Sequence, residues 1–273
     1  MAALTKKALE KDYLWLQLKD MPYFRAVLRA VECRFYQDYN LETPTLDLGC
    51  GDGHFATLAF EHKLEVGIDP WTAPVFEAGQ RGGYHLTVQG YGDCLPFPDG
   101  YFGSTVSNSV LEHIPGLDAT VMDIGRVMKP GALFLFCVPN HQFLANLSIS
   151  NTLDRLGLRS LGDAYRAFFN RISRHQHCDS PEVWRARLEA AGFRIEKYWH
   201  YFSPRALHVL EWGHYFGLPA WITHAVFKRW IITPQPWNLA LTRKIVEPAY
   251  SEAWEQPQGA YTFYVARKQA HTS

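Results

Sequence analysis

The period of the hydrophobic pattern changes once along the chain, close to position 45. Before it, apolar residues after Pro22 recur at helical spacing and charged residues lie off that stripe, which predicts a helix with this proline in its first turn. After it, short apolar runs alternate with helical segments. This pattern predicts strands at 45–48, 65–68, 84–88, 103–108, 132–138, 194–199 and 262–266, and helices at 53–62, 73–79, 118–128 and 181–191.

Alternating strands and helices predict an α/β fold with a doubly wound, Rossmann-like sheet that is mostly parallel and covered on both faces. Two segments interrupt the alternation, residues 141–179 and residues 203–259. We therefore expect a single domain over residues 1–273. Its parts are an N-terminal helical segment at 1–43, a core at 44–140, a cap insertion at 141–179 and an aromatic helical insertion at 203–259.

The composition of the chain indicates which class of partner and which cellular compartment to expect. Apolar residues make up 47% of the chain, and 27 Lys and Arg balance 27 Asp and Glu, so the net charge is zero. Proteins that follow phosphate backbones are normally basic, which makes nucleic acid an unlikely partner. Five scattered cysteines without a CxxC pair predict reduced thiols in the cytoplasm. No apolar stretch has the length of a membrane span, and the first residues lack the pattern of a signal peptide.

Three glycines, Gly49, Gly51 and Gly53, stand at alternate positions in "LDLGCGDG", directly after the first expected strand. Such glycines let a backbone approach a ligand closely. A dinucleotide-binding loop would need its third glycine at the position of His54, and a P-loop would need Lys followed by Ser or Thr. Asp47, which ends the apolar run, would repel a phosphate. A cationic ligand without phosphate therefore fits the loop better.

S-adenosylmethionine is such a ligand, because it carries an ammonium and a sulfonium. Asp47 is expected to accept a charge-assisted hydrogen bond from the ammonium, and backbone N–H groups near the next helix to meet the carboxylate. Asp69 ends the second strand in "LEVGID" and is expected to accept from both ribose hydroxyls. Pro70 and Trp71 would flank the adenine. Cys50 is expected to line the cofactor loop as a small filler, not as a nucleophile.

Residues 46–140 contain five motifs in order, "LDLGCGDG", "VGIDP", "GDCLPFPDGYF", "SNSVLEHI" and "RVMKPGALFLFCVPN". In this order and spacing the chain resembles class I S-adenosylmethionine-dependent methyltransferases of the type-11 branch. The resemblance implies methyl transfer and a seven-stranded sheet whose last strand is antiparallel. It also implies that Asp93 receives the adenine amino group, that the Cys94 amide meets the ring, and that Asn108 faces the methionine part of the cofactor.

Two histidines are candidates for catalysis. His113, in "LEHI" after the fourth strand, lies on the carboxyl side of the sheet, where a neutral imidazole can take a proton from an acceptor. A structural or cofactor-side role is the favoured alternative, because "LEHI" is common in the resembled branch, whose acceptors differ widely. His141 follows the fifth strand in "VPNH" and either lines the acceptor pocket or lies in a solvated loop.

The stretch "RHQHCDS" carries His175, His177, Cys178 and Asp179, residue types that bind metal ions. Their spacing allows two ligands, but the sequence reveals no distant pair that would complete a site. We therefore expect a loop before the next helix and no bound metal.

Aromatic residues concentrate in the insertion at 203–259. They include Trp212, Tyr215, Phe216, Trp221, Phe227, Trp230 and Trp237. Three roles stay open, in this order of preference: a lid over an apolar acceptor, plain core or a contact in a homodimer, and a peripheral membrane surface.

Together these features predict an enzyme that transfers a methyl group from S-adenosylmethionine to a small molecule. The apolar insertion and the zero net charge favour a partly hydrophobic or lipid-linked acceptor, and methylation at oxygen, nitrogen or carbon stays open. Two alternatives remain. One is a protein of the same fold with non-methylating chemistry, and the other is a cofactor-binding scaffold that regulates a partner.

Overall fold

The computed structural model describes residues 11–227 and 229–270, with the side chains of residues 218–222, among them Trp221, outside the description. The chain divides into two compact units. Unit 1 consists of Met1–Asp38, Gln142–Ser173 and His200–Ala260, and unit 2 of Tyr39–His141, Arg174–Trp199 and Tyr261–Ser273. The single domain expected from the sequence stays a prediction, and each unit is described by itself.

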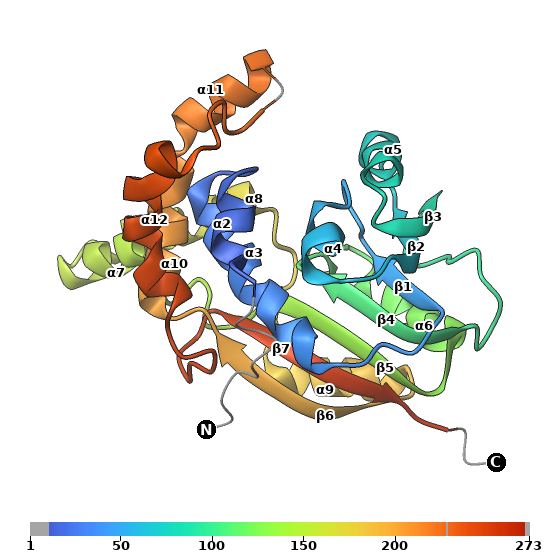
Figure 1. Ribbon diagram of the computed structural model, residues 1–273. Coiled ribbons are helices and arrows are strands. Elements are labelled where there is room, and N and C mark those ends of the chain that lie inside the picture. The colour runs from blue at the N-terminus through green and yellow to red at the C-terminus, as the bar shows by residue number, and fades with distance from the viewer. Residues whose placement is uncertain (1–10, 228, 271–273) are drawn as a thin grey trace. The chain divides into compact units, whose positions relative to one another are not determined.

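Unit 2 is built on a seven-stranded sheet of order β3-β2-β1-β4-β5-β7-β6 (Figure 1). Its strands are β1 (Thr45–Leu48), β2 (Leu64–Asp69), β3 (Tyr84–Gln89), β4 (Phe102–Asn108), β5 (Met128–Pro139), β6 (Phe193–Tyr201) and β7 (Tyr261–Lys268). Strands β1 to β5 pair in parallel, whereas β7 runs antiparallel to β5. The predicted α/β sheet and its antiparallel last strand are confirmed, and every predicted strand lies inside an observed one.

The helices of unit 2 cover the sheet. They are α4 (His54–Ala59), α5 (Thr72–Arg81), the short 3-10 helix η2 (Leu111–His113), α6 (Leu117–Val127) and α9 (Pro181–Ala190). Figure 1 shows α4 and α5 next to β1, β2 and β3, and α6 and α9 partly hidden behind β4, β5 and β7. On the α6–α9 side, Ile124 and Trp184 share a buried apolar cluster with Phe134 and Phe136 of β5. Burying such side chains contributes about 1.5–3 kcal/mol each.

The parallel pairing fixes where the candidate site lies. Asp47 pairs with Gly67, and Asn108 pairs with Cys137. The carboxyl ends of β1, β2, β4 and β5 therefore meet at one edge of the sheet, the edge at which open α/β sheets bind ligands.

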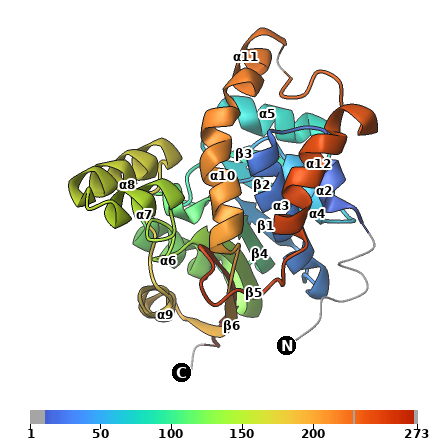
Figure 2. The ribbon, with the colours of Figure 1, turned by 90° about the vertical axis from the view of Figure 1, so that its left-hand side faces the viewer.

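Apart from the last two residues of β6, the described elements of unit 1 are helices (Figure 2). They are α2 (Tyr13–Leu18), α3 (Tyr23–Phe35), η1 (Tyr36–Asp38), α7 (Ser148–Arg155), α8 (Arg159–Ser173), α10 (Pro204–Phe216), α11 (Leu218–Phe227) and α12 (Pro236–Tyr250). No helix within the described ranges is both long enough and apolar enough to cross a bilayer.

Helix α3 is more deeply buried than its sequence predicts, because α2, α10 and α12 all pack against it. Glu32 and Arg34, expected on its polar side, are buried. The Glu32 carboxylate accepts a hydrogen bond from the Tyr201 hydroxyl at 2.8 Å, and Arg34 donates to the Tyr250 carbonyl at 2.9 Å. Pro22 is the N-cap of α3 and precedes its first turn, one residue earlier than predicted.

Candidate functional site

The glycine loop leaves β1 with a backbone that favours glycine at three positions. Gly49, Gly51 and Gly53 have φ values of 78°, 52° and 76°, in the left-handed region that other residues rarely adopt. A Cβ on Gly49 would stand 2.3 Å from a methyl carbon of Val110. A Cβ on Gly51 would meet nothing within 4 Å. The loop is therefore closely packed against Val110 at Gly49, while its backbone at Gly51 is open to a ligand.

Asp69, at the end of β2, holds this loop in place. Its carboxylate accepts from the Gly51 amide at 3.1 Å and from the Trp71 amide at 3.0 Å. The side chain is nearly buried, with 9% of its surface exposed. A carboxylate has about four acceptor positions, so two bonds to the loop leave capacity for hydroxyl donors.

Asp47 is buried deeper and bonds to a strand rather than to the loop. Its carboxylate accepts from the Tyr84 hydroxyl at 2.6 Å. Burial raises the pKa of the Asp47 carboxyl to about 7, although the Tyr84 hydrogen bond acts in the opposite direction. Burial also raises the pKa of the neighbouring Cys50 thiol, which therefore stays neutral. A neutral thiol is a poor nucleophile, and the role of Cys50 as a filler stays a prediction.

The other residues expected at the cofactor lie along the same edge of the sheet. Trp71 is 68% exposed directly after β2, and Asp93 and Cys94 are exposed in the loop that precedes β4. The Asn108 side-chain oxygen, at the end of β4, accepts from the Cys137 thiol at 3.1 Å. These positions surround an edge that carries acidic groups and exposed backbone, which suits a cationic ligand with an adenine ring.

Three residues at this edge were not predicted from the sequence. Tyr84 bonds to Asp47, Val110 fills the space beside Gly49, and Ser109 has a φ of 52°. A non-glycine residue in this region is strained, and such strain gathers at functional sites. Ser109 and Val110 lie within the motif "SNSVLEHI", but the sequence carries no signal for Tyr84, which meets Asp47 only through the pairing of strands.

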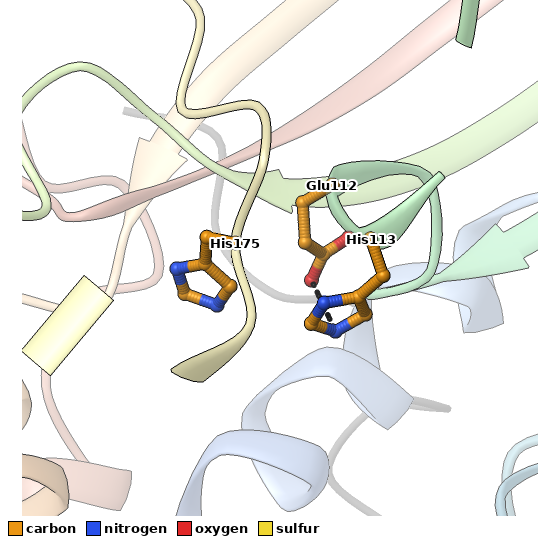
Figure 3. A group of neighbouring side chains, drawn as sticks. All are labelled: Glu112, His113 and His175. Atoms are coloured by element: carbon orange, nitrogen blue, oxygen red, sulfur yellow. Dashed lines mark ion pairs between the residues drawn. The ribbon is translucent and has the colours of Figure 1, made fainter. Parts of the chain in front are cut away.

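His113 ends η2, the turn after β4, and is held by a neighbouring segment. Its Nδ1 lies 3.0 Å from the carbonyl oxygen of Arg174, and its Nε2 lies 3.7 Å from Oε1 of Glu112. His175, beyond Arg174, places its ring centroid 5.5 Å from that of His113. Figure 3 shows His175 opposite the Glu112–His113 pair. The structure thus brings part of "RHQHCDS" to "LEHI", a proximity that the sequence did not reveal.

His141 is exposed in the loop after β5, and His177 is partly buried in the segment that precedes α9. The Nε2 of His177 lies 3.1 Å from the Ile114 carbonyl oxygen, and its Nδ1 lies 3.6 Å from the Asp179 carboxylate. His177 therefore fixes the loop in place.

A sequence profile described as a methyltransferase domain matches residues 23–198. The chain is 29% identical over 152 residues to a malonyl-(acyl-carrier protein) O-methyltransferase of Serratia marcescens, an alignment that covers 55% of this chain and 53% of that protein. It is 27% identical over 191 residues to the ubiquinone/menaquinone biosynthesis C-methyltransferase UbiE of Shewanella sp. (strain ANA-3), covering 60% and 74%. The chain thus spans about half the length of the first of these relatives.

Solved structures share the fold at low sequence identity. A protein of Thermotoga maritima, described as a possible histamine N-methyltransferase, aligns with a TM-score of 0.54 at 14% identity, covering 94% of this chain and 93% of that one. The geranyl diphosphate C-methyltransferase of Streptomyces coelicolor A3(2), solved with Mg²⁺, geranyl diphosphate and S-adenosyl-L-homocysteine, aligns with a TM-score of 0.54 at 13% identity, covering 99% and 89%. The cyclase SpnF aligns with a TM-score of 0.55 at 17% identity, covering 90% and 81%.

Proposed function

We propose, because the chain belongs to the class I S-adenosylmethionine-dependent methyltransferases, that it transfers a methyl group from this cofactor to a small acceptor with a hydrophobic or lipid-linked part. One observation carries the assignment of the cofactor site. The loop after β1 has three glycines at positive φ, one of which is open to solvent, and a nearly buried carboxylate bonds to its backbone.

The cofactor residues of this proposal lie on the loop and along the same sheet edge. They are Asp47, Gly49, Cys50, Gly51, Gly53, Asp69, Pro70, Trp71, Asp93, Cys94 and Asn108. Asp69 would accept hydrogen bonds from the ribose hydroxyls through the carboxylate lone pairs that are not bonded to the loop amides. Asp47 would accept from the ammonium, since a positive charge favours the ionised form of a buried carboxyl.

Bound S-adenosylmethionine supplies an electrophilic methyl group on a good leaving group. The contribution of the protein itself is therefore to place the acceptor and to exclude water. An acceptor that must lose a proton would also need a base. His113 is a candidate, because donation from Nδ1 to the Arg174 carbonyl leaves the lone pair on Nε2. His141, exposed after β5, is a second candidate.

The hydrophobic character of the acceptor is inferred from unit 1. Its segment at 203–259 exposes large apolar side chains on α10, α11, α12 and the residues between them. They are Trp212, Phe216, Val226, Phe227, Ile232, Trp237, Leu241 and Ile245. Exposed apolar groups in such number favour binding of an apolar partner. We assign them to the acceptor first, and to a second copy of the chain or a membrane surface after it.

Calorimetry with S-adenosylhomocysteine tests the cofactor site. Asp69→Ala is expected to lower the affinity at least tenfold, whereas Glu77→Ala, which removes an exposed carboxylate on α5, should leave it unchanged. Equal affinity of both variants would contradict the ribose assignment.

Turnover assays separate the possible functions. Acceptors of one functional group and increasing chain length should yield S-adenosylhomocysteine at increasing rates. Consumption of an acceptor without this product would indicate non-methylating chemistry, and binding without any turnover would indicate a scaffold. Flotation with anionic vesicles and light scattering test membrane contact and dimer formation.

A further inference from the structure

Three metal-ligating side chains meet in unit 2, just beyond the carboxyl end of β4. Glu112, His113 and His175 each present one ligand atom, and these atoms all lie within 4.8 Å of one another (Figure 3). Bonds to a metal ion of about 2.0–2.2 Å need ligand atoms roughly 3–4 Å apart. The Nε2 of His113 and Oε1 of Glu112, 3.7 Å apart, already have such a separation.

The two segments that carry these ligands are tied together by their backbones. The amides of Gln176 and His177 both donate to the Glu112 carbonyl oxygen, at 2.8 and 3.2 Å. His177 bonds in turn to the Ile114 carbonyl. His175 is therefore held opposite the Glu112–His113 pair by rigid main-chain contacts, which lowers the cost of organising a site.

The orientation of His113 matches that of a metal ligand. Histidines that bind metals usually donate their second ring N–H to a carbonyl or carboxylate, which fixes the ring and leaves the other nitrogen free to coordinate. Here Nδ1 lies 3.0 Å from the Arg174 carbonyl oxygen, while Nε2 lies next to the Glu112 carboxylate. Arg174 itself has a φ of 58°, a strained conformation that aims this carbonyl at the imidazole.

We propose that Glu112, His113 and His175 bind one divalent transition-metal ion of the Zn²⁺ class. Two imidazoles and one carboxylate form a donor set that suits zinc and related ions and leaves coordination positions open. The carboxylate is 1% exposed, and a cation bound to it would offset the cost of burying its charge. This departs from the sequence expectation of no metal, since Glu112 and His113 are the distant pair that the sequence did not reveal.

A bound ion would change the chemistry of the edge. Its open positions can take an acceptor oxygen or sulfur and lower the pKa of that group. This consequence, unlike the site itself, depends on the proposed methyl transfer. Coordination would also occupy the Nε2 lone pair of His113 and so exclude this residue as the base.

Metal titration of the full chain tests the site without any turnover. After treatment with a chelator, the protein is titrated with Zn²⁺ by calorimetry and with Co²⁺ by visible absorption, which reports coordination geometry. We expect one equivalent of Zn²⁺ to bind and Co²⁺ to give d–d bands. His175→Ala should weaken Zn²⁺ binding at least about 100-fold and abolish the bands. His85→Ala, which removes an exposed histidine on β3, is the matched control and should behave like the wild type.

Failure of this proposal is distinguishable from failure of the proposed function. Absence of stoichiometric Zn²⁺ binding in the wild type would overturn the metal site, as would equal binding by His175→Ala and His85→Ala. Circular dichroism and the melting temperature verify that His175→Ala is folded, and the half-exposed position of His175 favours this. Glu112→Gln gives a second test from the other segment, with weaker binding again expected.

Discussion

An added side chain would meet different surroundings at Gly51 and at Gly49, although both lie in the proposed cofactor loop at positive φ. Gly51→Ala meets no atom within 4 Å, so only backbone strain of about 1–2 kcal/mol should lower the free energy of unfolding. The affinity of this variant for a cofactor that binds against the open backbone should nevertheless fall at least tenfold. Gly131→Ala, also at a positive φ (83°) and with no atom within 4 Å of its Cβ, should lower stability to a similar extent without changing affinity.

Gly49→Ala should be far more harmful, because its Cβ would overlap Val110. Strain and overpacking together predict a loss of about 2–5 kcal/mol. Urea unfolding and calorimetry with S-adenosylhomocysteine measure both effects. Similar stabilities for the Gly49 and Gly51 variants would show that the loop does not pack as described.

Asp47 makes the stability of the protein depend on pH. Its pKa of about 7 in the folded state exceeds the usual value of about 3.9 in an unfolded chain. The folded state thus keeps a proton that the unfolded state has released, so stability falls as pH rises from about 4 to 7, by at most about 1.4 kcal/mol per pH unit.

Asp47→Asn should remove this contribution. Between pH 5 and pH 7.5, the free energy of unfolding of the wild type should fall by about 2–3 kcal/mol more than that of the variant. Urea denaturation of both proteins at the two pH values measures the difference. Parallel pH profiles would mean that the Asp47 carboxyl is already ionised at pH 5.

Residues whose role follows from local spacing could be predicted, and residues that act through distant partners could not. The glycines and Asp69 are set by their distance along the chain from strand ends, so the sequence is enough to find them. Tyr84 reaches Asp47 across β2, and His175 lies near Glu112 because the segment before α9 returns to the end of β4. Neither proximity leaves a trace in the spacing of residues.

At the scale of elements, α6 fixes the loop that carries Asp93 and Cys94. Arg126 donates to the Leu95 and Phe97 carbonyls, each at 2.9 Å. The residue is exposed, so Arg126→Met should cost less than about 1 kcal/mol of stability. It should nevertheless lower the affinity for S-adenosylhomocysteine about three- to tenfold, because the loop proposed to contact adenine loses its support.

Arg267→Met is the matched control for this prediction. Arg267 is also exposed and also pairs with a carboxylate, that of Glu196 at 2.5 Å, but it lies on β7. Its replacement should leave cofactor affinity unchanged. Equal effects of the two variants would contradict a link between α6 and cofactor binding at the loop that carries Asp93 and Cys94.

In unit 1, a buried carboxylate stabilises the start of α7. Glu211 of α10 accepts from the Ser148 amide at 2.7 Å and the Ile149 amide at 3.1 Å, where the N-cap residue of α7 supplies no side-chain acceptor. Negative charge at a helix N-terminus is favourable, and buried amides without an acceptor are costly. Glu211→Gln should lower the free energy of unfolding by about 2–4 kcal/mol.

Urea unfolding checks this prediction against Glu247→Gln, whose carboxylate is half-exposed on α12 and pairs with Arg243. The control should lose less than about 1 kcal/mol. A loss of similar size in both variants would mean that α7 does not depend on Glu211 for its cap.

Strands were easier to predict than the helices of unit 1, for a physical reason. Short apolar runs bounded by turns mark buried strands, because parallel strands are covered on both faces. The helices of unit 1 bury charged residues as well as apolar ones. Glu32 is fully buried on α3 and Glu211 on α10, each satisfied by a partner far away in the sequence. Patterns of polarity therefore fail to show which faces are buried.

At the scale of the whole molecule, the chain enters and leaves the sheet unit several times. The three segments of unit 1 alternate along the sequence with those of unit 2, and the chain enters unit 2 for the second time at Arg174, next to His175. A ligand at the sheet edge of unit 2 therefore stabilises contacts between segments that are far apart in the sequence. The cofactor binds the native state, so it should stabilise the protein by about 2.7 kcal/mol at a concentration of 100 times Kd.

Hydrogen exchange shows where this stabilisation acts. With S-adenosylhomocysteine at saturation, amide protection should increase in the glycine loop, at the end of β2, around Asp93 and at the end of β4, because those backbones carry the proposed contacts. The helices α7 and α8 of unit 1 are the internal reference, and their exchange should change least. In Asp69→Ala, the added protection at the glycine loop should disappear at the same ligand concentration. Protection confined to unit 1, or unchanged by Asp69→Ala, would place the cofactor elsewhere than the loop after β1.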